Sequence, residues 1–486
     1  MTEKVLFWFR DDLRLTDNPA LAAAVQTEKP LHLIYIVDDS SLHGRALGAA
    51  QRWWLNHSLE RLSADIAALG GQLHLYRGDP SVVIPSLVEA LKPTTVFWTR
   101  RYHKEQVACD TALKANIESS GSTVRSYNGS LLREPWEVTS KLGTPMRVFT
   151  PYWRAARLDF VVPQPAPAPS RLAPSTPIRN GPKPTSLAEL NLLPRNPDWS
   201  GGLSEAWIPG ENGARVTLDR FISEGFAGYG DSRNRPDLPS TSRLSPYLRF
   251  GEVSIRQVWH ATEAAYHSGQ TRASSEDLRI FQSELGWREF SYHLLFHQPD
   301  LSSINVQRSF DQFNWRNDPV MLDAWKRGQT GYPIVDAGMR ELWQTGFMHN
   351  RVRMIVASFL IKHLRIDWRE GEAWFWDTLL DADPASNPAS WQWVAGSGAD
   401  AAPYYRIFNP MLQGEKFDPD GRYVRRFVPE LASLPSLVIH APWTARPLEL
   451  SSFGVKLGST YPAPLVNHER AREDALAAYK ALKETA

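Results

Sequence analysis

The first 130 residues alternate short apolar runs with stretches of helical periodicity, and this alternation constrains the fold more than any other feature of the chain. The apolar runs lie at 5–9, 31–37, 73–76 and 95–98. Between them lie helical stretches such as 51–69. Short runs buried on both faces, each followed by a helix, are typical of parallel strands in a doubly wound sheet. We therefore expect an α/β domain whose ligands bind at the carboxyl ends of its strands.

The rest of the chain follows a different pattern. Proline, serine and asparagine dominate residues 161–209, and this composition cannot propagate a helix or a sheet. Beyond it, apolar residues keep helical spacing at 278–296, 322–327, 337–363 and 373–380. The sequence therefore predicts an α/β domain at 1–130, an interdomain linker at 131–209 and a larger all-α domain at 210–486.

Composition excludes several classes of protein. Hydrophobic residues make up 42% and charged residues 22% of the 486 residues, as in folded globular proteins. No uncharged apolar stretch approaches membrane-spanning length and no leader pattern opens the chain, so we expect a cytoplasmic protein that does not contact a membrane. The single cysteine, Cys109, excludes an intramolecular disulfide and a multi-cysteine metal site. The net charge of +1 means that any affinity for DNA must come from a local basic surface.

The segment FQSELGWREF at 281–290 is the first candidate for chemistry. On a helix, Glu284 and Arg288 share one face, with Trp287 beside them. Taken alone, this pattern is typical of an exposed ion pair next to a core tryptophan.

The segment GFMHNRVRM at 346–354 lies within the helix predicted over 337–363, so its polar residues cannot all face solvent. Asn350 and Met354 share a face of that helix. Buried polar side chains need partners, and a carboxylate such as Asp381 would serve Arg353. Such a pair is either a structural salt bridge or part of a cofactor wall.

Two further segments combine capping patterns with polar chemistry. In DADPASNPASWQW at 381–393, Asn387 and the proline after it form a good N-cap and first helical position. The two close carboxylates in this segment have no accompanying histidine, so we expect no metal site. The hydroxyls and helix start of TSRLSP at 241–246 suit either a cap or a phosphate.

In this order, these segments resemble the photolyase/cryptochrome family. So do FRDDLRLTDNPAL at 9–21, TGYPIVD at 330–336 and RIFNP at 406–410. The resemblance covers nearly the whole chain and is weakest in the proline-rich linker. It implies a DNA repair enzyme that carries FAD, bent into a U shape in the helical domain, and reverses pyrimidine dimers with light.

The resemblance also implies a set of FAD-binding residues. They are Tyr229, Thr241, Ser242, Arg243, Leu244, Ser245, Phe281, Arg288, Arg353, Asp381, Asp383 and Asn387. Within the set, Thr241, Ser242 and Ser245 would hold the pyrophosphate, and Arg353 with Asp381 would flank the isoalloxazine. Asn387 would face flavin N5, where an amide can accept or donate a hydrogen bond.

Photolyases are among the enzymes that flip their target out of the duplex, so the resemblance implies a lesion pocket. Trp287 and Trp393 match positions that pack against the dimer. Glu284 and Asn350 match positions that hydrogen-bond its bases, and Met354 completes the catalytic set. The implied DNA-contacting residues are Arg233, Glu284, Trp287, Asn350, Arg351 and Gln413. Trp391, Trp368 and Trp315 match the three tryptophans that relay an electron to excited flavin.

Three differences from other branches of the family favour repair of cyclobutane pyrimidine dimers, by an enzyme of class I or class III. Plant-type cryptochromes usually carry Asp at the position of Asn387, and many cryptochromes have a long C-terminal tail. The (6-4) photolyases carry a histidine pair where this chain has Asn350 and Met354. A cryptochrome-type photoreceptor and a (6-4) photolyase remain the alternatives.

The antenna chromophore is the least constrained feature. Relatives that bind folate use an Asn-Glu pair, and Glu105 and Gln106 align there with the carboxylate displaced by one position. 5,10-Methenyltetrahydrofolate is the first choice, and an 8-hydroxy-5-deazaflavin or no antenna are the alternatives. The expected partner is UV-damaged DNA, bound by a monomer that needs no other protein.

Overall fold

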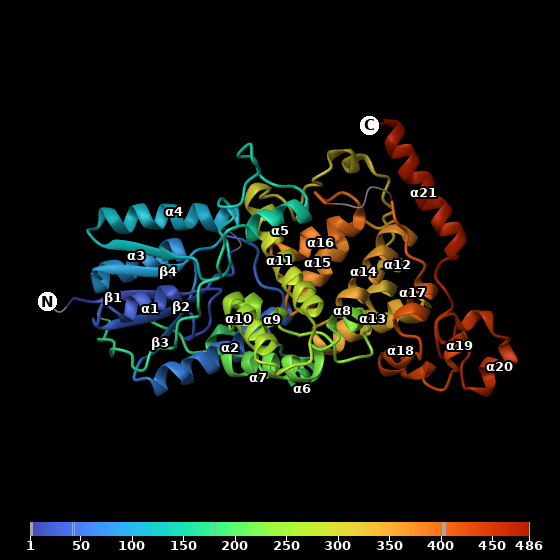
Figure 1. Ribbon diagram of the computed structural model, residues 1–486, viewed down its shortest axis with the longest axis horizontal. Coiled ribbons are helices and arrows are strands. Elements are labelled where there is room, and N and C mark those ends of the chain that lie inside the picture. The colour runs from blue at the N-terminus through green and yellow to red at the C-terminus, as the bar shows by residue number, and fades with distance from the viewer. Residues whose placement is uncertain (1–2, 41, 43, 179, 401–404, 486) are drawn as a thin grey trace. The chain divides into compact units, whose positions relative to one another are not determined.

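The computed structural model describes residues 3–40, 42, 44–178, 180–400 and 405–485 (Figure 1). The chain divides into two compact units. Unit 1 comprises Met1–Ala227, Ser242–Pro299 and Leu380–Pro384, and unit 2 comprises Gly228–Thr241, Asp300–Leu379 and Ala385–Ala486.

Unit 1 begins with the predicted sheet. Among the described residues, five parallel strands pair in the order β3-β2-β1-β4-β5. They are β1 (Val5–Phe9), β2 (Leu31–Val37), β3 (Leu73–Arg77), β4 (Thr95–Thr99) and β5 (Thr123–Tyr127). The connecting helices are α1 (Pro19–Val25), α2 (Ala49–Ala68), α3 (Pro80–Leu91) and α4 (Lys104–Ser119). The doubly wound α/β fold is confirmed, and β5 is an edge strand that the sequence analysis did not identify.

The remaining helices of unit 1 follow the sheet. They are α5 (Phe149–Arg157), the short η1 (Ala188–Leu190), α6 (Gly201–Ala206), α7 (Glu211–Arg220), η2 (Phe221–Gly225), α9 (Ser245–Phe250), α10 (Ile255–His267) and α11 (Ser275–His297). The proline-rich stretch is mostly irregular, but η1 and α6 interrupt it. It touches the edge of the sheet, where the Thr185 N–H donates to the Leu75 carbonyl at 2.8 Å.

In the described residues of unit 2, the regular elements are helices joined by loops, with one isolated bridge between Leu457 and Tyr461, and the helical character predicted for this part of the chain is confirmed. Its helices are α8 (Tyr229–Ser232), η3 (Arg308–Gln312), α12 (Pro319–Lys326), α13 (Pro333–Thr345), α14 (Asn350–Ser358), η4 (Phe359–His363), α15 (Trp368–Thr378), α16 (Ser386–Ala395), α17 (Pro410–Phe417), α18 (Arg422–Phe427), η5 (Pro429–Leu431), α19 (Ser436–Ile439), η6 (Pro442–Thr444), α20 (Pro447–Ser452) and α21 (His468–Thr485). Over the described part of the chain, no helix is long and apolar enough to cross a bilayer.

Two local predictions are wrong. The single helix expected over 337–363 is broken at Gly346, whose φ of 64° ends α13 in the left-handed conformation. A new helix, α14, starts at Asn350, and the His349 side chain caps it by accepting from the Arg351 N–H at 3.2 Å. Asn387 is not an N-cap, because α16 already begins at Ser386 with Ala385 as its cap.

Candidate active site

The predicted site residues are divided between the two units. In unit 1, the segment 380–384 carries the acidic pair Asp381 and Asp383, which are 8% and 6% exposed. The Ala382 carbonyl accepts from Gln51 Nε2 at 2.5 Å and from Arg249 Nε at 3.0 Å. These two bonds fix the backbone from which both carboxylates project.

Arg249 on α9 connects this segment to Asp11. Its Nη1 donates to Asp11 Oδ1 at 2.7 Å. Burial alone would lower the pKa of Arg249, but the negative charge of Asp11, with smaller contributions that include Asp383, raises it above its usual value. The guanidinium therefore stays charged beside the acidic segment.

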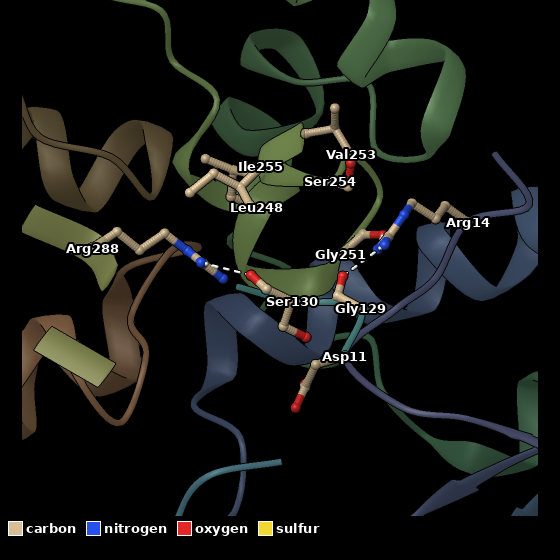
Figure 2. A pocket seen from close by; sticks show the side chains of 10 residues that line it. All are labelled: Asp11, Arg14, Gly129, Ser130, Leu248, Gly251, Val253, Ser254, Ile255 and Arg288. Carbon is tan, nitrogen blue, oxygen red and sulfur yellow. Dashed lines mark hydrogen bonds between the residues drawn. The ribbon is translucent and has the colours of Figure 1, made fainter. Parts of the chain in front are cut away.

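Arg288 lies on α11, one turn after Glu284, as the helical spacing predicted. Its Nη1 donates to the Ser130 carbonyl at 2.8 Å, and its guanidinium lies 4.9 Å from the centre of the Tyr292 ring. Figure 2 shows Arg288 and Arg14 reaching the adjacent carbonyls of Ser130 and Gly129. The small pocket beside them is lined by Asp11, Arg14, Gly129, Ser130, Leu248, Gly251, Val253, Ser254, Ile255 and Arg288.

The predicted phosphate segment and Phe281 have distinct surroundings. Ser242 and Arg243 are half-buried, Leu244 is buried and Ser245 is exposed at the start of α9, whereas Thr241 is half-buried and belongs to unit 2. Arg243 has a φ of 54° and lies 4.3 Å from the centre of the Trp207 ring. The Phe281 ring packs against Phe221 and Phe226, which is a core contact.

In unit 2, the side chain of Asn387 is held by a residue that sequence analysis missed. Asn387 Nδ2 donates to Glu372 Oε1 at 2.7 Å and to the Glu372 carbonyl at 3.1 Å. Because a carboxylate and a carbonyl only accept, the amide orientation is determined by chemistry. The oxygen Oδ1 is therefore the atom that Asn387 presents away from Glu372.

Two relay candidates lie at the packing of α15 against α16. The Trp391 ring presses on Gly371, where an added Cβ would lie 2.1 Å from Trp391 Cη2. Gly371 follows Trp368 by three residues and therefore shares its face of α15. Both indoles are buried, at 2% and 0% exposure, and Trp368 Nε1 donates to Asn305 Oδ1 at 2.9 Å.

The third relay candidate, Trp315, is half-buried. Its ring lies 4.4 Å from that of Phe313, in a cluster with Phe310 and Tyr405. Trp315 thus has the solvent access that the outer end of a relay requires, while Trp391 and Trp368 do not.

The predicted DNA-contacting residues of unit 2 gather around α14. Arg351 Nε and Nη2 both donate to Asn234 Oδ1, at 3.2 and 2.8 Å. Its guanidinium also lies 4.6 Å from the centre of the Phe417 ring on α17, one turn after Gln413. Burial and the positive charge of Arg233 lower the pKa of Arg351. Arg351 and Arg233 are thus two positive charges close enough to interact, and the hydrogen-bond partner of Arg351, Asn234, is neutral.

The other unit 2 candidates lie on α8, α14 and α16. Asn350 is exposed at the start of α14, Met354 and Trp393 are half-buried, and Tyr229 is buried under the guanidinium of Arg233 at 5.6 Å. Arg353 Nε donates to the Met348 carbonyl at 2.7 Å.

The antenna candidates lie in unit 1, in the first turn of α4. Glu105 Oε2 is 2.5 Å from His103 Nδ1, and the Gln106 side chain lies against Gly44. In the described residues, no group of three or more His, Cys, Asp or Glu side chains is placed to hold a metal ion.

Comparison with known proteins identifies the family. Residues 5–170 match the family model described as DNA photolyase, and residues 281–481 match the FAD binding domain of DNA photolyase. A deoxyribodipyrimidine photo-lyase of Agrobacterium fabrum is 53% identical over 484 residues, which cover 100% of this chain and 99% of the relative. The chain belongs to the photolyase/cryptochrome family.

Solved structures and plant relatives agree with this membership. The crystal structure of a bacterial class III photolyase from Agrobacterium tumefaciens matches with a TM-score of 0.94 and 52% identity, over 100% of this chain and 98% of that one. Cryptochrome-1 of Arabidopsis thaliana is 38% identical over 96% of this chain and 69% of its own length. Both photolyases and cryptochromes are therefore similar to this chain.

Proposed function

We propose that the protein is a deoxyribodipyrimidine photo-lyase that splits cyclobutane pyrimidine dimers in DNA with light and FAD. The main support for this proposal is the 53% identity, over essentially the full length of both chains, to a deoxyribodipyrimidine photo-lyase. The orientation of Asn387 adds support, because its amide presents an acceptor while Glu372 holds its N–H₂ group.

The FAD-binding residues that the family resemblance assigns suit the chemistry of that cofactor. Hydroxyls of Thr241, Ser242 and Ser245 suit a pyrophosphate, and Asn387 Oδ1 suits a flavin N5 that carries a proton. The remaining assigned residues are Tyr229, Arg243, Leu244, Phe281, Arg288, Arg353, Asp381 and Asp383. When bound and reduced, FAD supplies the light-excited electron that opens the cyclobutane ring and is then returned.

The chain's own residues bind and orient the flipped lesion. Trp287 and Trp393 present aromatic faces to its apolar surface, and Asn350 and Glu284 supply hydrogen bonds to its bases. A carboxyl group at Glu284 stabilises the negative charge that develops on those bases. Met354 cannot donate a proton, which supports a cyclobutane dimer over a (6-4) product as substrate.

Attraction to DNA comes from the group of Arg233, Arg351 and Gln413, since the whole chain is nearly neutral. The hydrogen-bond partner of Arg351, Asn234, is a neutral amide, so this contact does not offset the positive charge of the guanidinium. Such contacts to phosphates position the duplex without reading its sequence.

The class, oligomeric state, location and antenna chromophore of the enzyme can also be proposed. We propose a class III type for the enzyme, like the photolyase structure from Agrobacterium tumefaciens. We also propose that it acts as a monomer in the bacterial cytoplasm and, from the motif resemblance alone, that it binds methenyltetrahydrofolate near Glu105 and Gln106. The domain boundaries at residues 130 and 209 belong to the same proposal.

The substrate choice is tested with two oligonucleotides, one carrying a cyclobutane thymine dimer and one a (6-4) product. The FAD-loaded, reduced protein should repair the first under blue light, should not repair it in the dark, and should leave the second unchanged. Repair of the (6-4) product would contradict the substrate assignment. FAD binding with no repair of either oligonucleotide would favour a photoreceptor.

A further inference from the structure

Helix α5 packs against α11 within unit 1 (Figure 1). Helix α5 lies in the stretch that the sequence assigned to the interdomain linker, whereas α11 carries the proposed lesion residue Trp287. A contact between them therefore ties a segment with no expected function to the proposed site.

Two neighbouring contacts define how these helices fit. Trp153 lies on Gly286, where an added Cβ would come within 2.6 Å of the indole. One turn earlier on α5, the Phe149 ring lies 3.8 Å from that of Trp287 with only 9° between the ring planes. Glycine at 286 permits the close approach of α5, and this approach places Phe149 on the adjacent residue of α11.

Two more aromatic rings lie near Phe149. Trp153 is nearly parallel to it at 6.4 Å and 14°, and Phe290 meets both Phe149 and Trp287 with its edge at about 6 Å. The Trp287 indole is therefore covered on one face by the parallel ring of Phe149, and the Phe290 ring packs beside it at a steep angle.

We propose that Phe149 is a positioning residue for lesion binding, which acts by stacking on one face of Trp287. The inference rests on the proposed function, because it takes Trp287 as the residue that packs against the dimer. With one face covered, a base of the dimer can stack only on the opposite face. The parallel contact also fixes the indole before DNA arrives, so less side-chain freedom is lost on binding.

Substitutions at Phe149 separate stacking from simple apolar packing. Phe149→Leu keeps an apolar side chain but removes the flat ring, and Phe149→Tyr keeps the ring. Aromatic pairs contribute enough for Phe149→Leu and Phe149→Ala to weaken binding of a dimer-containing oligonucleotide by about three- to tenfold. Phe149→Tyr should bind within about twofold of the parent, since the same ring contact remains.

Phe160→Ala is the matched control. Phe160 is also a half-buried phenylalanine just after α5, but its ring lies under the Arg133 guanidinium at 4.7 Å. This variant should leave dimer affinity unchanged. Affinity of the Phe149 variants for undamaged DNA should also be unchanged, because phosphate contacts dominate that binding.

A double-mutant cycle with Trp287→Ala decides the mechanism. If Phe149 acts through Trp287, Phe149→Ala should change dimer affinity by less than about twofold once Trp287 is absent. The same three- to tenfold loss in both backgrounds, or no loss in the parent background, would overturn the inference. A Trp287→Ala variant that binds dimer as the parent does would instead overturn the assignment of Trp287 in the proposed function.

Discussion

Replacing Asn387 with Asp would test the contact that orients this side chain. In the parent, Asn387 Nδ2 lies 2.7 Å from Glu372 Oε1, and Asn387 is 8% exposed. Asn387→Asp places a second carboxylate oxygen at that distance from the first. Two buried carboxylates so close cannot both ionise, and one must keep a proton at neutral pH.

The cost follows from the resulting pKa shift. Burial and the like charge should raise the pKa of the introduced carboxyl from about 4 in the unfolded chain to about 7 in the native protein. At pH values between these two pKa values, unfolding of the variant releases this proton. The stability of the variant relative to the parent is therefore greatest below pH 4 and falls as the pH rises toward 7. The slope is about 1.4 kcal/mol per pH unit, and the total loss is about 4 kcal/mol at pH 7 and above.

The measurement is the urea concentration of half-unfolding from pH 5 to pH 8, for parent and variant loaded equally with FAD. Asn387→Ser is the control, because it loses the same hydrogen bonds without a titrating group and should be destabilised equally at every pH. Adding Glu372→Gln to Asn387→Asp should restore most of the loss, since the new amide can donate to the carboxylate. If the Asn387→Asp curve runs parallel to the parent curve across this range, the described contact with Glu372 is wrong.

Four further outcomes are expected. Trp391→Phe should bind FAD but fail to photoreduce it with an external thiol, while the chemically reduced variant still repairs dimers; photoreduction at the parental rate would remove Trp391 from the relay. Arg351→Ala should flatten the slope of log affinity against log salt by about one, and an unchanged slope would place the DNA elsewhere. Glu284→Ala should lower repair per absorbed photon more than it lowers dimer affinity, and equal repair per photon would exclude Glu284 from the chemistry. Burial raises the pKa of Glu252 from 4.5 to about 8, so unfolding releases its proton and the free energy of unfolding falls as the pH rises from about 5 to 8. Glu252→Gln should remove from this pH dependence a slope of up to about 1.4 kcal/mol per pH unit. Identical pH profiles of unfolding for parent and variant would contradict this cause.

The sequence predicted the four strands that contain a run of mostly apolar residues. β1 and β2 are buried on both faces, so they form continuous apolar runs. β5 lies at the edge of the sheet and alternates exposed and buried residues at its start, which leaves no such run. A mostly apolar run is thus what makes a short strand visible in one sequence, and β3 was predicted from such a run although it is the other edge strand and is only partly buried.

Local chain geometry was less predictable. The apolar periodicity continues across Gly346, so only the left-handed conformation of that residue reveals the break between α13 and α14. Asn387 followed by proline has the pattern of a cap, yet its amide is engaged by Glu372. Glu372 and Phe149 could not be found from sequence, because each acts through a residue far away in the chain.

Return of the electron to the flavin is tested by the number of dimers repaired per FAD when no electron donor is present. The protein is reduced beforehand, freed of reductant and illuminated without oxygen in the presence of excess dimer-containing oligonucleotide. If the electron returns after each ring opening, every FAD should support the repair of many dimers, and none should be repaired in the dark. Repair that stops at about one dimer per FAD, or that never starts although dimer and FAD are bound, would contradict the account.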